Sequence, residues 1–168
     1  SVVVAGEDLT VAMRVVHKEF FGERNERINL FIAGYGNVAK ELVNIISGKE
    51  DISIAGIANS KKMVFSKRGI DPQKISELLE KGEDTDIGKF LNTAGGFGLG
   101  KSLFIDCTAS GLVASSYSEF ALNGFSVVTC NKIAFSAPGE NWRRMREAFS
   151  SNGKKLHYET TVGAALPV

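Results

Sequence analysis

Short apolar runs alternate with longer segments in which apolar residues recur at helical spacing, over all but the first 27 residues of the chain. Apolar runs of about four to eight residues without alternation are typical of strands buried on both faces. Strands that alternate with helices predict a parallel, doubly wound α/β sheet with right-handed crossovers. The runs predicted as strands are Ile28–Ala33, Ile52–Ala58, Ser102–Cys107, Phe125–Thr129 and Lys155–Glu159.

Helices are predicted in the intervals between these strands. Val38, Leu42 and Ile46 recur at helical spacing directly after the first strand. Asp71 followed by Pro72 predicts a helix start, because a capping side chain and a proline at the first position both suit that end. The other predicted helices are 71–81, 85–91, a helix that begins at the Thr108–Gly111 cap and contains Tyr117 to Leu122, and Glu140–Ser151.

The first 27 residues predict a separate, smaller unit. Ser1–Ala5 is a short apolar strand candidate, and Leu9–Phe21 has apolar residues along one helical face. Gly22–Arg27 is charged and turn-prone, which is typical of a linker. The sequence therefore predicts two parts, a strand and helix in residues 1–27 and a main α/β domain in residues 28–168.

A glycine turn, Gly34-Tyr35-Gly36-Asn37-Val38-Ala39, directly follows the first predicted strand and opens the first predicted helix. This is the context that a dinucleotide-binding motif requires in a Rossmann-like sheet. Gly34 would allow a tight turn, Gly36 would let the backbone approach a pyrophosphate, and Ala39 would let helix and strand pack closely. The helix N-terminus would add free N–H groups and a positive dipole. The motif predicts nucleotide binding, and a purely structural glycine turn is the alternative.

The end of the second predicted strand bears on the choice of nucleotide. Folds selective for NAD place a carboxylate roughly 20 residues after the glycines, where it binds the ribose hydroxyls. Here the strand ends in Asn59, Ser60, Lys61 and Lys62, with no acidic residue. These side chains could bind a 2′-phosphate, so the sequence favours NADP, with NAD as the alternative cofactor. Solvated loop lysines are the alternative interpretation.

Two further segments are rich in glycine or small hydroxyl residues. Gly95–Gly100 has the richest glycine content of the chain but precedes a predicted strand, so we expect a surface loop rather than a phosphate cradle. Thr108, Ala109 and Ser110 follow a strand, at the edge where an open α/β sheet binds ligands. Ordinary capping of the next helix is compatible with that role.

The composition of the 168 residues fits one sizeable core, with 43% hydrophobic and 23% charged residues. A net charge of +1 gives no electrostatic reason to expect nucleic acid or an acidic membrane as partner. No apolar run approaches the roughly 20 residues of a membrane span, and the expected compartment is the cytoplasm. Cys107 and Cys130 lack metal-site spacing, so we expect reduced, partly buried thiols.

Three motifs share one predicted edge of the sheet: the glycine turn, Asp106-Cys107-Thr108-Ala109-Ser110 and Val128-Thr129-Cys130-Asn131-Lys132. In order and spacing they resemble the cofactor domain of homoserine dehydrogenases. Tyr158–Val168 resembles that family's junction into its catalytic region, and the resemblance covers residues 28–168. Met13–Phe21 is similar to the end of the aspartokinase regulatory region in bifunctional aspartokinase and homoserine dehydrogenase proteins. We therefore expect a piece of a longer, bifunctional protein.

The resemblance implies reversible, NAD(P)H-dependent reduction of L-aspartate 4-semialdehyde to L-homoserine, in the branch leading to threonine and methionine. It places Thr108 and Thr129 on the path towards the nicotinamide, and Lys132 beside nicotinamide and substrate. There the Lys132 ammonium would orient the aldehyde oxygen or assist proton transfer. A lysine that only caps the strand end is the alternative. The predicted cofactor-binding residues are Gly34, Tyr35, Gly36, Asn37, Val38, Ala39, Asn59, Ser60, Lys61, Thr108, Ala109, Ser110, Thr129, Asn131 and Lys132.

The resemblance also implies a site for a monovalent cation such as sodium, at Glu159 and the backbone carbonyls of Val162, Ala164 and Leu166. One carboxylate and several carbonyl oxygens suit a hard alkali ion rather than zinc. The family's substrate-binding acidic residues and its principal catalytic lysine would follow Val168. This piece is therefore expected to bind nucleotide without turning over substrate alone. A small-molecule substrate and a homo-oligomer are expected of the full-length protein.

Two other classes of protein fit part of the sequence. A non-catalytic Rossmann module that binds nucleotide or senses redox state would explain the glycines, but not the Thr129–Lys132 and Glu159–Pro167 motifs. An S-adenosylmethionine methyltransferase also has a glycine turn after its first strand. It usually has an acidic residue at the end of the second strand, where this chain has Asn59.

Overall fold

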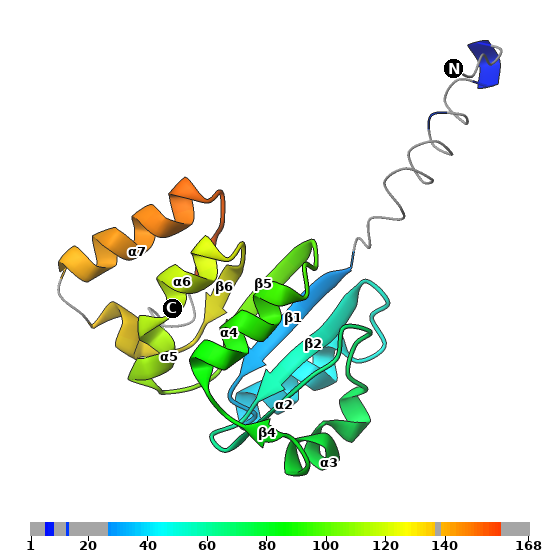
Figure 1. Ribbon diagram of the computed structural model, residues 1–168, viewed down its shortest axis with the longest axis horizontal. Coiled ribbons are helices and arrows are strands. Elements are labelled where there is room, and N and C mark those ends of the chain that lie inside the picture. The colour runs from blue at the N-terminus through cyan, green and yellow to red at the C-terminus, as the bar shows by residue number, and fades with distance from the viewer. Residues whose placement is uncertain (1–5, 9–12, 14–26, 137–138, 159–168) are drawn as a thin grey trace, which may run out of the picture.

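The computed structural model describes residues 6–8, 13, 27–136 and 139–158. Within them, a seven-stranded sheet has the strand order β4-β3-β2-β1-β5-β6-β7 (Figure 1). The strands β2, β1, β5, β6 and β7 run parallel, which confirms the predicted doubly wound α/β class. The strands are β1 (Ile28–Ala33), β2 (Ile52–Ala58), β3 (Lys62–Phe65), β4 (Glu83–Asp84), β5 (Lys101–Asp106), β6 (Ser126–Thr129) and β7 (Leu156–His157).

The connecting elements are helices and short 3-10 turns. The helices are α2 (Asn37–Ile46), α3 (Ile75–Glu80), α4 (Ile87–Gly96), α5 (Gly111–Ser115), α6 (Tyr117–Leu122) and α7 (Gly139–Ser151). The 3-10 turns are η1 (Gly6–Asp8), η2 (Pro72–Lys74) and η3 (Lys132–Phe135). The predicted Asp71 cap is confirmed, since its carboxylate accepts a hydrogen bond from the Gln73 amide at 3.0 Å. None of the helices described has the length and apolar character that crossing a membrane requires.

Helices cover both faces of the sheet (Figure 1). Residues of α4, α5, α6 and α7 form one core with phenylalanine side chains of the strands, and residues of α2 and α3 form the other. The central strand β1 contributes to both, with Phe31 on one face and Leu30 and Ile32 on the other. This explains why its sequence is apolar without alternation. The parallel strands β2, β1, β5, β6 and β7 have their carboxyl ends at one edge of this sheet.

The structure corrects the sequence-based prediction in three places. The single helix predicted as far as Leu122 is two short helices, α5 and α6, that meet at Ser116. β3 and β4, which the sequence analysis does not predict, pair antiparallel with β2 and with each other, so the sheet is mixed rather than wholly parallel. Gly95 and Gly96 are expected in a surface loop but form the last turn of α4, where a helix tolerates glycine. The loop begins only after them, at Gly98, which has a φ of +61°.

Most of the predicted N-terminal unit lies outside the described residues. This holds for the strand at 1–5, for the linker at 22–26, and for all of the 9–21 helix except Met13. Gly6–Asp8 forms η1. The predicted division of the chain into an N-terminal unit and a main domain, between residues 27 and 28, therefore stays a prediction.

Candidate functional site

The glycine turn connects β1 to α2, and its two glycines differ in what the fold requires of them. Gly34 has a φ of +89°, and a Cβ there would lie 2.8 Å from the Thr108 methyl group and 2.9 Å from the Cys107 carbonyl oxygen. At Gly36, φ is −95° and a Cβ would meet nothing within 4 Å. Ala39 is fully buried beneath the turn. Gly34 and Ala39 therefore serve the packing, whereas the open side of Gly36 is free for a ligand.

A cleft of about 710 Å³ opens at the carboxyl ends of β1, β2 and β5. Its walls come from the glycine turn, the end of β2, the β4–α4 connection and the β5–α5 loop. Its volume is in the range of small-molecule sites, and its position is where open α/β sheets bind ligands. The predicted site residues that line the cleft are Gly34, Tyr35, Gly36, Asn59, Ser60, Thr108, Ala109 and Ser110.

The cleft also contains residues that sequence reasoning missed. Thr85, Asp86 and Ile87 line it from the turn before α4. The Thr85 hydroxyl donates a hydrogen bond to the Asn59 carbonyl oxygen at 3.0 Å. The Thr85 backbone amide donates another to the Lys61 carbonyl oxygen at 2.9 Å. The pairing of β4 with β3 brings this segment to the end of β2. The sequence signal that could have indicated the segment was Asp86, a residue type that favours the N-cap of a helix and caps α4 here. The remaining lining residues that were missed are Ala33, Ala58, Phe90, Leu112 and Val113.

Asn59 organises the turn at the end of β2. Its side-chain oxygen accepts hydrogen bonds from the amides of Lys61 at 2.8 Å and Lys62 at 2.7 Å, so the chain reverses into β3. The Lys62 ammonium pairs with Asp84 at 3.0 Å. Lys61 and Lys62 both line a neighbouring pocket of about 320 Å³, together with Lys40 from the first turn of α2 and the acidic Glu80 of α3. This pocket shares Asn59 with the cleft, so its lysines lie beside the β2 end of the cleft.

Asp106, Tyr117, Thr129 and Asn131 form a buried polar cluster beneath the strand ends, each at most 2% exposed. One Asp106 carboxylate oxygen accepts from the Tyr117 hydroxyl at 2.5 Å and from the Asn131 amide group at 3.0 Å. The Thr129 hydroxyl oxygen lies 2.6 Å from that of Tyr117 and accepts from the Asn131 backbone amide at 2.9 Å. Thr129 and Asn131, predicted as cofactor-binding residues, therefore face this cluster and do not line the cleft.

Lys132 begins η3, which Asn131 caps by accepting from the Ile133 amide at 3.1 Å. The Lys132 side chain is exposed and lies outside the lining of the cleft. Asn37 and Val38, also predicted as cofactor residues, are exposed at the start of α2 and do not line it either.

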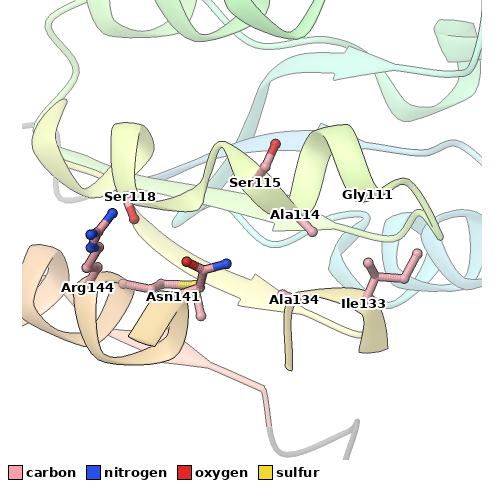
Figure 2. Close-up of a pocket in the computed structure, with 9 residues that line it drawn as sticks. Gly111, Ala114, Ser115, Ser118, Ile133, Ala134, Asn141 and Arg144 are labelled. Carbon is pink, nitrogen blue, oxygen red and sulfur yellow. The ribbon is translucent and has the colours of Figure 1, made fainter. Parts of the chain in front are cut away.

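A second cavity of about 380 Å³ lies beside η3, between it and the helices α5, α6 and α7 (Figure 2). Ile133 and Arg144 are among its lining residues, and the Arg144 guanidinium pairs with Glu140 at 2.7 Å.

Cys107 and Cys130 are free, partly buried thiols that follow the ends of β5 and β6. Burial, with a smaller effect of the neighbouring Cys130, raises the pKa of the Cys107 thiol to about 12. At neutral pH this thiol is protonated and a poor nucleophile. The predicted cation ligands Glu159, Val162, Ala164 and Leu166 lie outside the described residues.

The family described as homoserine dehydrogenase, NAD binding domain, matches residues 34–159. Bifunctional aspartokinase/homoserine dehydrogenase 2, chloroplastic, from Arabidopsis thaliana is 34% identical over 179 residues, a match that covers 100% of this chain and 19% of the plant protein. The chain therefore spans about a fifth of the length of the curated relatives that it matches.

Two solved structures share the fold over 84% of this chain, each with 25% sequence identity. One is homoserine dehydrogenase from Thermoplasma acidophilum, with a TM-score of 0.66 over 46% of that chain. The other is a Candida auris protein of unknown function, with a TM-score of 0.74 over 41% of that chain.

Proposed function

Since this chain belongs to the homoserine dehydrogenase family through its NAD-binding domain, we propose that it forms the cofactor-binding part of an enzyme that reversibly reduces L-aspartate 4-semialdehyde to L-homoserine. The observation that carries the proposal is the 710 Å³ cleft at the strand ends, with the open side of Gly36 in its lining. The substrate site would come from the rest of the protein, which we propose to be a homo-oligomer in the cytoplasm that serves threonine and methionine biosynthesis.

The nicotinamide cofactor would supply the hydride, and the residues of this chain would bind and orient it. No described side chain caps the N-terminus of α2, so its backbone N–H groups suit a pyrophosphate. The β5–α5 loop, with Thr108 and Ser110, would line the path to the nicotinamide. Lys132 would hold a proton or a positive charge beside the aldehyde oxygen, from the end of β6.

We propose NADP as the cofactor rather than NAD. The end of β2 carries Asn59 and Ser60 where a carboxylate would bind an unphosphorylated ribose. Lys61 and Lys40 line the pocket next to it and would supply positive charge for a 2′-phosphate. Lys62 lines the same pocket, but its ammonium is paired with Asp84.

Nucleotide titration tests the proposed function directly. The chain is expected to bind NADPH and NADH, in that order of affinity, and not S-adenosylmethionine. Intrinsic fluorescence of Trp142 or calorimetry gives the three dissociation constants. Binding of S-adenosylmethionine alone would favour a methyltransferase, and binding of none of the three would contradict the proposal.

Asn59→Asp is expected to reverse the preference between NADPH and NADH. The new carboxylate can accept the same two amide hydrogen bonds from Lys61 and Lys62, so the turn is kept. Its charge would bind the 2′-hydroxyl of NADH and repel the 2′-phosphate of NADPH. The ratio of the two dissociation constants checks this, with Asn44→Asp as a control of equal charge on an exposed position of α2. A wild-type preference for NADH of tenfold or more would contradict the NADP assignment.

For the cation site, we propose that Glu159 and the carbonyls of Val162, Ala164 and Leu166 hold a monovalent ion such as sodium in the complete enzyme. The support for this is the chemistry of the donors, which are all oxygen atoms with a single negative charge.

A further inference from the structure

The buried polar cluster is bonded to the backbone of both loops that follow β5 and β6. Asp106 accepts a hydrogen bond from the Thr108 amide at 2.7 Å. The Asn131 side chain donates to the Ser110 carbonyl oxygen at 2.9 Å and accepts from the Ile133 amide at 3.1 Å. The first loop lines the cleft and the second leads into η3. The four side chains therefore tie the shape of the cleft wall to the end of β6.

One arrangement of protons satisfies the contacts within the cluster. Tyr117 donates its single hydroxyl hydrogen to Asp106. The Tyr117 oxygen must therefore accept a hydrogen bond from the Thr129 hydroxyl. The Thr129 oxygen in turn accepts one from the Asn131 backbone amide. Burial and the hydrogen bond to Asp106 raise the pKa of Tyr117, so the phenol keeps its proton at neutral pH. No buried side-chain oxygen or nitrogen in the described part of the chain lacks a partner. Loss of one hydroxyl would therefore take one hydrogen bond from each of its two neighbours in the cluster.

From this geometry we propose that Tyr117 and Thr129 are positioning residues of the nucleotide site. Through Asp106 and Asn131 they hold the β5–α5 loop in the shape that lines the cleft, without touching the nucleotide themselves. The inference rests on the proposed function for the identity of the ligand. In this proposal Thr129 supports the β5–α5 loop through hydrogen bonds and does not itself contact the nicotinamide.

Tyr117→Phe removes one oxygen atom and keeps the ring, which packs edge-on against Phe104 with centroids 6.5 Å apart. In the 168-residue chain, NADPH affinity is expected to fall about tenfold, because the anchored loop gains freedom that binding must remove. Amide hydrogen exchange without nucleotide is expected to become faster at residues 108–110 and 131–133. The two measurements are the dissociation constant for NADPH and the site-resolved exchange rates.

Substitutions at Thr129 give the matched comparison. Thr129→Val removes the hydroxyl at similar volume and should reproduce the effects of Tyr117→Phe, whereas Thr129→Ser keeps the hydroxyl and should bind NADPH as the wild type does. The double variant Tyr117→Phe with Thr129→Val should bind hardly worse than either single variant, since both break the same chain of hydrogen bonds. Phe149→Leu shrinks the same core from α7 and should lower thermal stability with unchanged affinity.

The inference is overturned if Tyr117→Phe and Thr129→Val lose stability as Phe149→Leu does while NADPH affinity and loop exchange stay at wild-type values. A wild-type chain that binds neither NADPH nor NADH would contradict the proposed function instead. In that case the exchange rates still decide the inference, because they need no nucleotide: unchanged rates overturn it, and faster rates confined to the two loops support it.

Discussion

Gly36→Val is expected to weaken NADPH binding by about a hundredfold or more, roughly 2.8 kcal/mol, while the chain still folds. A Cβ at this position meets no other atom within 4 Å, and a φ of −95° is open to any residue. The space that valine would fill belongs to the cleft, at the place where a pyrophosphate would approach the backbone. Valine is a weaker N-cap than glycine, which should cost about 1 kcal/mol of stability and not the fold.

Circular dichroism and thermal unfolding establish whether the Gly36→Val chain folds, and titration with NADPH gives its affinity. Gly34→Val is the matched control two residues away. It forces a β-branched residue to a φ of +89° and against the Cys107 carbonyl, so it should lower the melting temperature strongly. A folded Gly36→Val chain that binds NADPH with wild-type affinity would exclude this turn as the nucleotide site.

Contiguous signals made the centre of the fold predictable from the sequence. The apolar run, the glycines and the helical spacing of β1 and α2 are adjacent along the chain, and each requires the next. β3 and β4 lack such signals. β4 has two residues, Glu83 and Asp84, both exposed, and its position depends on backbone pairing with a strand some 20 residues earlier in the chain. Without β4, the sequence could not place Thr85 and Asp86 in the cleft.

The sequence predicted which strand ends form the candidate site. It did not predict which way each side chain at those strand ends points. Thr108 and Ser110 follow β5 and reach the cleft. Thr129 is still within β6, where the register pairs it with Asp106, so both side chains lie on the same face of the sheet. That face is covered by α6, whose Tyr117 contacts them both. A motif therefore identifies residues near a site, while the register of the strands decides which of them line it and which support it.

Lys132→Ala is expected to depress turnover by about a hundredfold or more in the full-length enzyme, the usual scale for one positioned acid–base or electrostatic group. A group that acts on the developing alkoxide contributes mainly in the transition state, so NADPH affinity should change far less than kcat. The Lys132 side chain is exposed, and its bond with Ser136 uses the backbone carbonyl, so truncation should leave η3 in place. Steady-state kinetics and NADPH titration of the same preparation separate the two effects.

Lys132→Arg distinguishes a positioned ammonium from a general positive charge. The guanidinium keeps the charge but differs in shape and does not readily give up a proton, so it should restore little of the lost turnover. Lys155→Ala removes an exposed lysine beside the amino end of β7, at the opposite edge of the sheet, and should leave both turnover and affinity unchanged. If Lys132→Ala stays within twofold of the wild-type turnover, Lys132 only caps the end of β6, and proton transfer to the aldehyde oxygen must be assigned to a residue outside this domain.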